Sequence, residues 1–268
     1  MTAVALAFND GIAIAKRNIL KTRRMPDVLL WTTMQPIMFV LLFAYIFGGS
    51  IKIPGSNYRE FLIAGIFAQN IIFGSTFTGT AIADDMQKGI IDRFRSLPMS
   101  RSAVLFGRTI SDVANNAAAM TVMAITGLIV GWRIRTSVPA AVGGFVLLLA
   151  FAYAISWVMA WVGLKVRRVE VVNSASFMFI FPMTFIANTF VPSQNLPGFL
   201  RSIAEWNPVS ALAQAARVAF GNAVPFISTS KAWSLNHPVA YTLMWIAVIL
   251  AVFVPLATRE YSRTKDTR

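Results

Sequence analysis

Side chains of the types that catalyse reactions or bind metals are few in this 268-residue chain. His237 is the only histidine and cysteine is absent, which excludes multi-histidine and thiolate metal sites. No glycine is followed directly by lysine, so the G-x-x-x-x-G-K-[ST] phosphate-binding loop is absent. The sequence therefore predicts no catalytic residue, no metal site and no nucleotide site in this chain.

Two small polar groups remain as candidates for ligand binding. Asp84 and Asp85 are adjacent and could hold a cation, but pairing of the acidic residues with Lys88 is favoured by the four-residue spacing. His237 precedes Pro238 and has no metal-ligand types beside it. We therefore expect a structural or neutral role for His237.

Amide side chains also occur inside long apolar stretches, where polar groups are unusual. They are Gln35, Gln69-Asn70, Asn115-Asn116 and Asn188. Such amides either join neighbouring helices by hydrogen bonds or line a path for a solute. Both interpretations stay open from the residues alone.

The elements that must position these amides are six apolar stretches without a charged residue. They cover about residues 28–51, 61–83, 113–132, 136–164, 171–191 and 239–258. As helices, each of them has enough residues to cross a hydrocarbon layer of about 30 Å. With 56% hydrophobic and only 13% charged residues, the chain is expected to be an all-α integral membrane protein with six transmembrane helices.

Acidic residues are predicted to lie only in loops or at the edges of these stretches. Ion-driven carriers and channels usually keep ionisable groups inside the membrane, so both are disfavoured alternatives for this chain. An intramembrane enzyme is disfavoured too, because the spans offer only amides, hydroxyls and aromatic rings. A transporter of this kind needs its driving force from a partner protein.

Basic residues set the expected orientation in the membrane. If the N-terminus is cytoplasmic, 17 of the 24 lysines and arginines lie on the cytoplasmic side. This asymmetry is the positive-inside pattern, and it predicts that both termini are cytoplasmic. The net charge of +13 then suits an anionic inner leaflet, and nucleic acid is not expected as a partner.

Residues 1–27 are predicted to form a cytoplasmic amphipathic helix on the membrane surface. Its apolar face consists of Val4, Phe8, Ile12, Ala15 and Ile19. The alternative is a solvated basic tail. At the other end, residues 259–268 are expected to form a short cytoplasmic tail.

The cytoplasmic loop 84–108 contains a predicted short helix. Ile90, Phe94 and Leu97 form its apolar face, while Pro98 ends it. So small a loop offers this face nothing to pack against, which favours the groove of a partner protein; the alternative is the membrane surface.

The external segment 190–237 contains two further short helices by periodicity. Leu196, Phe199, Leu200 and Ile203 form the face of the first, and residues 209–220 form the second, which Gly221 ends. Neither is long enough to span, so they are expected to lie in the outer interface or to re-enter the membrane.

Two sequence blocks carry a family resemblance. They are G-I-I-D-R-F-R-S-L-P-M-S-R at 89–101 and F-V-P-S-Q-N-L-P-G-F-L-R-S-I-A-E-W-N-P-V-S at 190–210, with A-x-R following at 215–217. With the six-span layout, the chain resembles the permease subunits of type-2 ABC exporters, and among them the daunorubicin-resistance (DrrB-like) drug-exporter permeases. The resemblance extends over nearly the whole chain, including the transmembrane domain expected at 28–258.

The resemblance implies roles for three sets of residues. Those of a coupling helix that docks on a cytosolic ATPase are Gly89, Ile90, Arg93, Phe94, Leu97, Pro98 and Arg101. Those of the external re-entrant motif are Pro192, Leu196, Pro197, Asn207, Pro208 and Arg217. Candidates for lining the substrate path are Gln35, Gln69, Asn70, Phe73, Phe181 and Asn188.

It also implies the assembly and the activity. Two permeases and two ATPase subunits would form the working unit in a bacterial plasma membrane, with ATP and Mg bound only by the ATPase subunits. The expected function is export of hydrophobic or amphipathic, drug-like compounds. The alternative within the family is export of a lipid, glycolipid or polysaccharide precursor.

Overall fold

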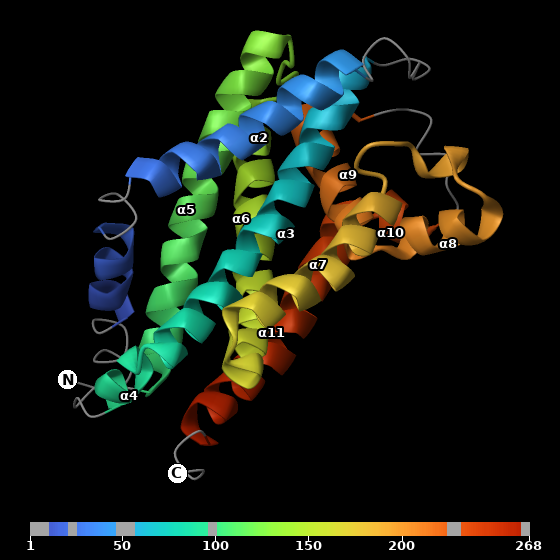
Figure 1. Ribbon diagram of the computed structural model, residues 1–268. Helices are drawn as coiled ribbons and strands as arrows, with labels where there is room; N and C mark the ends of the chain where they lie inside the picture. The colour runs from blue at the N-terminus through green and yellow to red at the C-terminus, as the bar shows by residue number, and fades with distance from the viewer. Residues whose placement is uncertain (1–10, 21–25, 47–56, 96–100, 224–231, 264–268) are drawn as a thin grey trace.

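The computed structural model describes residues 11–20, 26–46, 57–95, 101–223 and 232–263. Within these ranges the fold is helical and contains no strand. Figure 1 shows an elongated bundle of long helices, with short helices on its flank. The expected all-α class is therefore confirmed.

Five helices in the described part of the chain are long and apolar enough to cross a membrane. They are α3 (Tyr58–Gln87), α5 (Arg101–Val130), α6 (Val138–Val166), α7 (Val169–Ile186) and α11 (Pro238–Arg263). The first expected span coincides with α2 (Pro26–Ile46), whose described apolar part is Met34–Ile46. The count of six spans stays a prediction.

The expected loop 84–108 is much shorter in the structure. α3 continues to Gln87, and a turn at Gly89, with φ of 67°, leads into α4 (Ile90–Arg95). α5 already begins at Arg101, so residues 101–108 form its first two turns instead of a loop. Ala103 and Leu105 in these turns are buried, and this packing outweighs the loop-like charge of the segment.

The longer α5 places one acidic residue inside a helix, contrary to expectation. Asp112 lies eleven residues after the start of α5 and is only 2% exposed. Thr78 Oγ1 donates a hydrogen bond to its Oδ2 at 2.6 Å, and Arg108 Nε lies 3.4 Å from the same atom. Because the carboxylate is paired in this way, burying it is far less costly than burying an isolated charge.

α3 is the central helix, and it contacts α2, α5, α6, α7 and the short helix α9 (Pro208–Phe220). α3 and α6 meet backbone to backbone at Gly79 and Gly163. A Cβ atom on Gly163 would lie only 2.4 Å from the carbonyl oxygen of Gly79. Small residues at such a crossing allow membrane helices to approach closely.

The N-terminal helical segment 11–20 packs along α5, as Figure 1 shows. Ile14 and Ala15 are buried, and a Cβ atom on Gly107 would lie 2.4 Å from the carbonyl oxygen of Gly11. Ile12 and Ile19 remain 45% and 38% exposed. The predicted apolar face is therefore divided between α5 and the surroundings, while its residues Val4 and Phe8 lie outside the described ranges.

Candidate functional site

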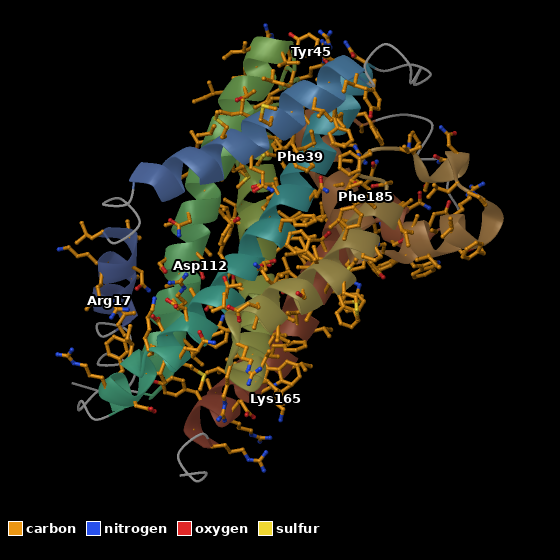
Figure 2. All side chains as sticks on the ribbon, viewed as in Figure 1. Arg17, Phe39, Tyr45, Asp112, Lys165 and Phe185 are labelled. Carbon is orange, nitrogen blue, oxygen red and sulfur yellow. The ribbon has the colours of Figure 1, made fainter. Side chains whose placement is uncertain are left out.

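One small cavity lies between α2, α3 and α7, and five of the six predicted path residues line it. Its volume is about 100 Å³. Its lining residues are Gln35, Phe39, Ile66, Gln69, Asn70, Phe73, Phe177, Phe181 and Phe185. Figure 2 labels Phe39 on α2 and Phe185 on α7, which flank the upper half of α3.

Helical spacing explains why these side chains converge. On α3, Ile66, Asn70 and Phe73 are separated by four and three residues and share one face. On α7, Phe177 and Phe181 follow each other at four-residue steps, with Phe185 next in the series. Two helices that meet along these faces form a wall of rings with amides at its edge.

Aromatic contacts cross and line this wall. The rings of Phe73 and Phe177 join α3 to α7 at a centroid distance of 5.7 Å. The rings of Phe181 and Phe185 are stacked at 4.2 Å. Such faces bind flat apolar or aromatic molecules by offset stacking.

The polar part of the cavity consists of uncharged amides. Gln69 is 3% exposed, and its Nε2 has no hydrogen-bond partner. A buried donor without a partner costs free energy, which a ligand oxygen could recover by accepting the bond. None of the lining residues carries a charge. The cavity is thus suited to an uncharged aromatic surface with an oxygen acceptor.

Asn188, the sixth path candidate, lies elsewhere. Its side chain is fully buried, and its Oδ1 accepts a hydrogen bond from Arg217 Nη1 at 3.2 Å. It belongs to the corner after α7 and not to the cavity lining. The partner, Arg217, is 29 residues away, and sequence spacing gave no signal for this pair.

Arg217 itself is a buried cation held by carbonyl groups. Its Nε donates to the carbonyl of Phe61 at 3.0 Å, and its Nη2 donates to those of Asn188 at 2.7 Å and Thr189 at 3.3 Å. The guanidinium is fully buried, and these carbonyl oxygens surround it in place of water. The side chain thereby joins α9 to α3 and to the chain after α7.

The other residues of the re-entrant motif build the two short helices as predicted. Pro197 precedes α8 (Gly198–Trp206), and Gly221 with φ of 72° ends α9. Asn207 Oδ1 caps α9 by accepting from Val209 N–H at 2.8 Å, with Pro208 at the first helical position.

Pro192 and Leu196 flank the 3₁₀ turn η1 (Ser193–Asn195). α9 is almost wholly buried against α3, α6 and α11, so it lies within the bundle and not on its surface. This position agrees with a helix that re-enters between the spans.

The predicted coupling residues lie around α4. Gly89 forms the turn before the helix, Ile90 is half-buried, and Arg93 is exposed. Phe94 is half-buried, and the guanidinium of Arg17 from the same chain lies 4.8 Å from its ring centre. The expectation that this apolar face has nothing of its own to pack against is therefore wrong.

Ile91 of α4 was not among the predicted coupling residues, and two of the predicted ones lie outside the residues that the structure describes. Ile91 is 2% exposed and anchors the helix in a core with Leu105 and Leu164. Leu97 and Pro98 lie outside the described residues, and Arg101 is the first residue of α5.

Two minor expectations can also be compared. Asp84 Oδ2 lies 2.7 Å from Lys88 Nζ, which confirms pairing as the role of this carboxylate. His237 lines a second, larger pocket between α9 and α11. Across the residues that the structure describes, no group of three potential metal ligands occurs.

The described helices that are long and apolar enough to span indicate a multi-pass membrane protein, and the comparison with known families defines its class as a transporter. The chain belongs to the ABC-2 type transporter family, whose model matches residues 11–220.

Three relatives illustrate this family membership. The chain is 30% identical to the daunorubicin resistance ABC transporter permease protein DrrB1 of Streptomyces coeruleorubidus, over 97% of this chain and 88% of that protein. It is 25% identical to the probable doxorubicin resistance ABC transporter permease protein DrrC of Mycobacterium tuberculosis, over 83% and 77%. It is 22% identical to the putative transport permease ycf38 of Porphyra purpurea, over 78% and 73%.

Proposed function

We propose that this chain is the membrane-spanning permease subunit of an ATP-driven exporter of amphipathic, partly aromatic drugs. The observation that carries the proposal is the cavity between α2, α3 and α7, with its phenylalanine wall and the unpartnered amide of Gln69. The relatives named for daunorubicin and doxorubicin resistance support the same substrate class, since both names refer to drug resistance.

The size and openness of the cavity favour a path shared by two copies of the chain. At about 100 Å³ it is smaller than the several hundred Å³ that drug-sized ligands occupy. Phe177, Phe181 and Phe185 on its α7 side are 51%, 49% and 40% exposed. A second permease facing these rings would enlarge the site and cover them.

The energy would come from a separate cytosolic ATPase that docks on α4. α4 and the last turn of α11 lie at the same end of the bundle, where Lys165 also lies (Figures 1 and 2). The positive-inside asymmetry supports assigning this end to the cytoplasm. Motion of α4 would pass to α3 through Gly89 and to segment 11–20 through the Arg17–Phe94 contact.

A drug-export assay with matched phenylalanine variants tests the proposal. A drug-sensitive bacterium would express the chain with its cognate ATPase, and efflux of fluorescent daunorubicin would be recorded. Phe181→Ala removes a ring that lines the cavity, whereas Phe179→Ala, two residues away, removes a ring that is 70% exposed and outside it. We expect slower efflux only for Phe181→Ala.

Two results would contradict the proposal. One is absence of ATPase-dependent daunorubicin efflux by the wild-type complex. The other is equal efflux by both variants, since the aromatic wall would then have no part in transport. Efflux driven by a pH or sodium gradient without an ATPase would instead assign the chain to the ion-coupled carriers.

A further inference from the structure

A second pocket, which shares no lining residue with the path cavity, lies where α9 approaches the start of α11. Its volume is about 670 Å³, which is within the range of small-molecule sites. Its lining residues are Gln214, Val218, Ala223, Leu235, Asn236, His237, Pro238, Val239, Ala240 and Leu243. The pocket lies at the start of α11, and α11 ends beside the C-terminus. The pocket is therefore in the half of the bundle that lies away from the C-terminus (Figure 1).

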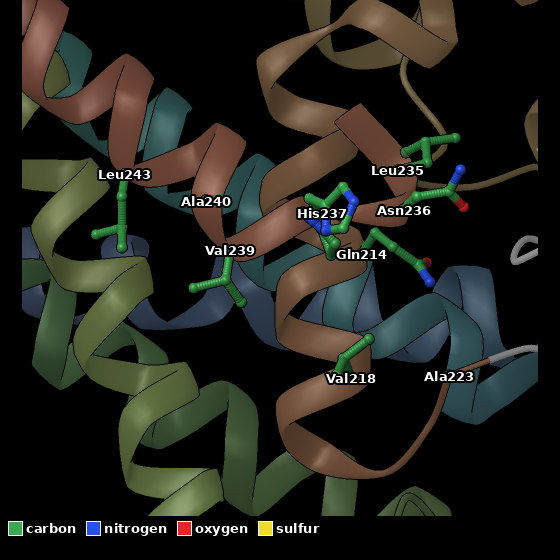
Figure 3. A pocket seen from close by; sticks show the side chains of 10 residues that line it. Gln214, Val218, Ala223, Leu235, Asn236, His237, Val239, Ala240 and Leu243 are labelled. Atoms are coloured by element: carbon green, nitrogen blue, oxygen red, sulfur yellow. The ribbon is translucent and has the colours of Figure 1, made fainter. Parts of the chain in front are cut away.

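The amide side chains lie toward one side of the pocket, with Leu235 beside them. Figure 3 shows Asn236 and Gln214 toward one side, His237 in the middle, and Val239 and Leu243 toward the other. Val239 and Leu243 are 44% and 51% exposed on a helix that is apolar enough to span a membrane. The apolar end therefore opens where acyl chains would lie.

The polar end contains a buried acceptor without a partner. Gln214 is 4% exposed, and its Oε1 makes no hydrogen bond. Leaving such an atom unsatisfied is unfavourable, so a donor from a bound molecule would stabilise the site. No acidic residue lines the pocket, so the acceptor that such a donor meets is an uncharged amide oxygen.

The first turn of α11 supplies donors to the same pocket. The intrahelical ladder starts with Tyr241 N–H, which donates to His237 O at 3.0 Å. Val239 and Ala240 come before Tyr241 in the chain, so their N–H groups have no carbonyl partner within the helix. Both residues line the pocket. N-terminal N–H groups of a long helix attract phosphate through hydrogen bonds and the helix dipole.

We propose that this pocket binds a membrane phospholipid whose headgroup carries an N–H donor, that is, one of the phosphatidylethanolamine class. Its ammonium group donates to Gln214 Oε1, its phosphate accepts from the start of α11, and an acyl chain lies along Val239 and Leu243. The trimethylammonium of phosphatidylcholine has no N–H and cannot make the first contact. This site does not depend on the proposed export function.

Competitive lipid retention tests this assignment. The purified full-length chain would be incubated with equal amounts of palmitoyl-oleoyl phosphatidylethanolamine and phosphatidylcholine, and retained lipids would be counted by native mass spectrometry. Both lipids are zwitterionic, so the basic surface of the protein favours neither. We expect the wild type to retain phosphatidylethanolamine preferentially.

Three variants separate the site from general lipid binding. Gln214→Leu removes the acceptor and should reduce the preference about tenfold, as expected for one hydrogen bond to a charged group. Gln87→Leu, at the exposed end of α3, is the matched control and should keep it. Ala240→Trp fills the pocket and should remove the retained lipid. Elution as a single species on size exclusion verifies that each variant is folded.

Several outcomes would overturn the proposal. Equal retention of the two lipids by the wild type would exclude headgroup recognition. If Gln214→Leu still retained phosphatidylethanolamine preferentially, Gln214 Oε1 would be excluded as the acceptor of the headgroup. Loss of dimer in Ala240→Trp without loss of lipid would mark the pocket as a contact between two copies. Because the assay needs neither ATPase nor drug, its failure leaves the export proposal untouched, and the reverse also holds.

Discussion

The guanidinium of Arg217 lies 3.6 Å from the ring centre of Phe61, while its Nε donates to the carbonyl of that same residue at 3.0 Å. The side chain of Arg217 thus contacts both the backbone and the ring of Phe61 on α3. Its two Nη atoms reach the chain after α7, so the short helix α9 is joined to both neighbours.

Replacing Arg217 by methionine should strongly destabilise the protein. The change leaves the buried carbonyls of Phe61 and Asn188 without a donor, and we expect a loss of about 3 kcal/mol. The melting temperature of the detergent-solubilised protein measures it. Arg201→Met, which breaks a half-exposed pair with Glu205, should change stability by less than about 0.5 kcal/mol. Equal melting temperatures for the two variants would contradict the bridging role of Arg217.

Alanine at Gly65 should also be destabilising, for a steric reason. A Cβ atom there would lie 2.0 Å from the backbone carbonyl oxygen of Thr189, and neither backbone can move aside easily. We expect a loss of about 2 kcal/mol, typical of overpacking. Gly143→Ala on α6 is the control, because beyond the adjoining backbone of its own helix no atom lies within 4 Å of its added Cβ. Chemical denaturation of both variants would test this, and a tolerated Gly65→Ala would show that α3 is not held so closely.

Phe94→Asp should uncouple ATP hydrolysis from the permease. The carboxylate would remove the apolar surface of α4 and the ring beneath Arg17, while the buried Ile91 still anchors the helix. In the reconstituted complex with the cognate ATPase, we expect normal insertion and loss of substrate-stimulated hydrolysis. Phe94→Leu keeps an apolar side chain and should retain most of the stimulation. Undiminished stimulation with aspartate would remove the coupling role.

Gln69→Leu should weaken drug binding without weakening the fold. The substitution removes a buried Nε2 that has no partner in the free protein, so the melting temperature should not fall. Loss of one neutral hydrogen bond to a drug oxygen predicts about fivefold weaker binding. Titration of daunorubicin by fluorescence would measure it. A large drop in stability with unchanged affinity would instead make Gln69 a structural link between helices.

Much of the architecture was predictable from local sequence. The short helices α8 and α9 were recognised because apolar residues recur at helical spacing and Asn207-Pro208 separates them. The start of α5 was misplaced because Arg101 and Arg108 suggested a loop. Arg108 is tolerated in the helix since it pairs with Asp112, which no local pattern reveals.

The candidate site was predictable only in part. Gln69, Asn70 and Phe73 share a helix face by spacing alone, but their meeting with Phe181 requires the packing of α7 on α3. Asn188 looked equivalent to them in composition. Its contact with Arg217 places it in a buried corner instead.

By itself the sequence determined the class: a chain with few charged residues and several long apolar stretches that form helices. These properties depend on composition and local periodicity, which do not require knowledge of distant contacts. The tertiary structure decided which polar groups are satisfied and which are not. Arg217 and Asp112 found partners across helices, whereas Gln69 and Gln214 kept unpaired atoms in cavities, because pairing depends on how the helices pack.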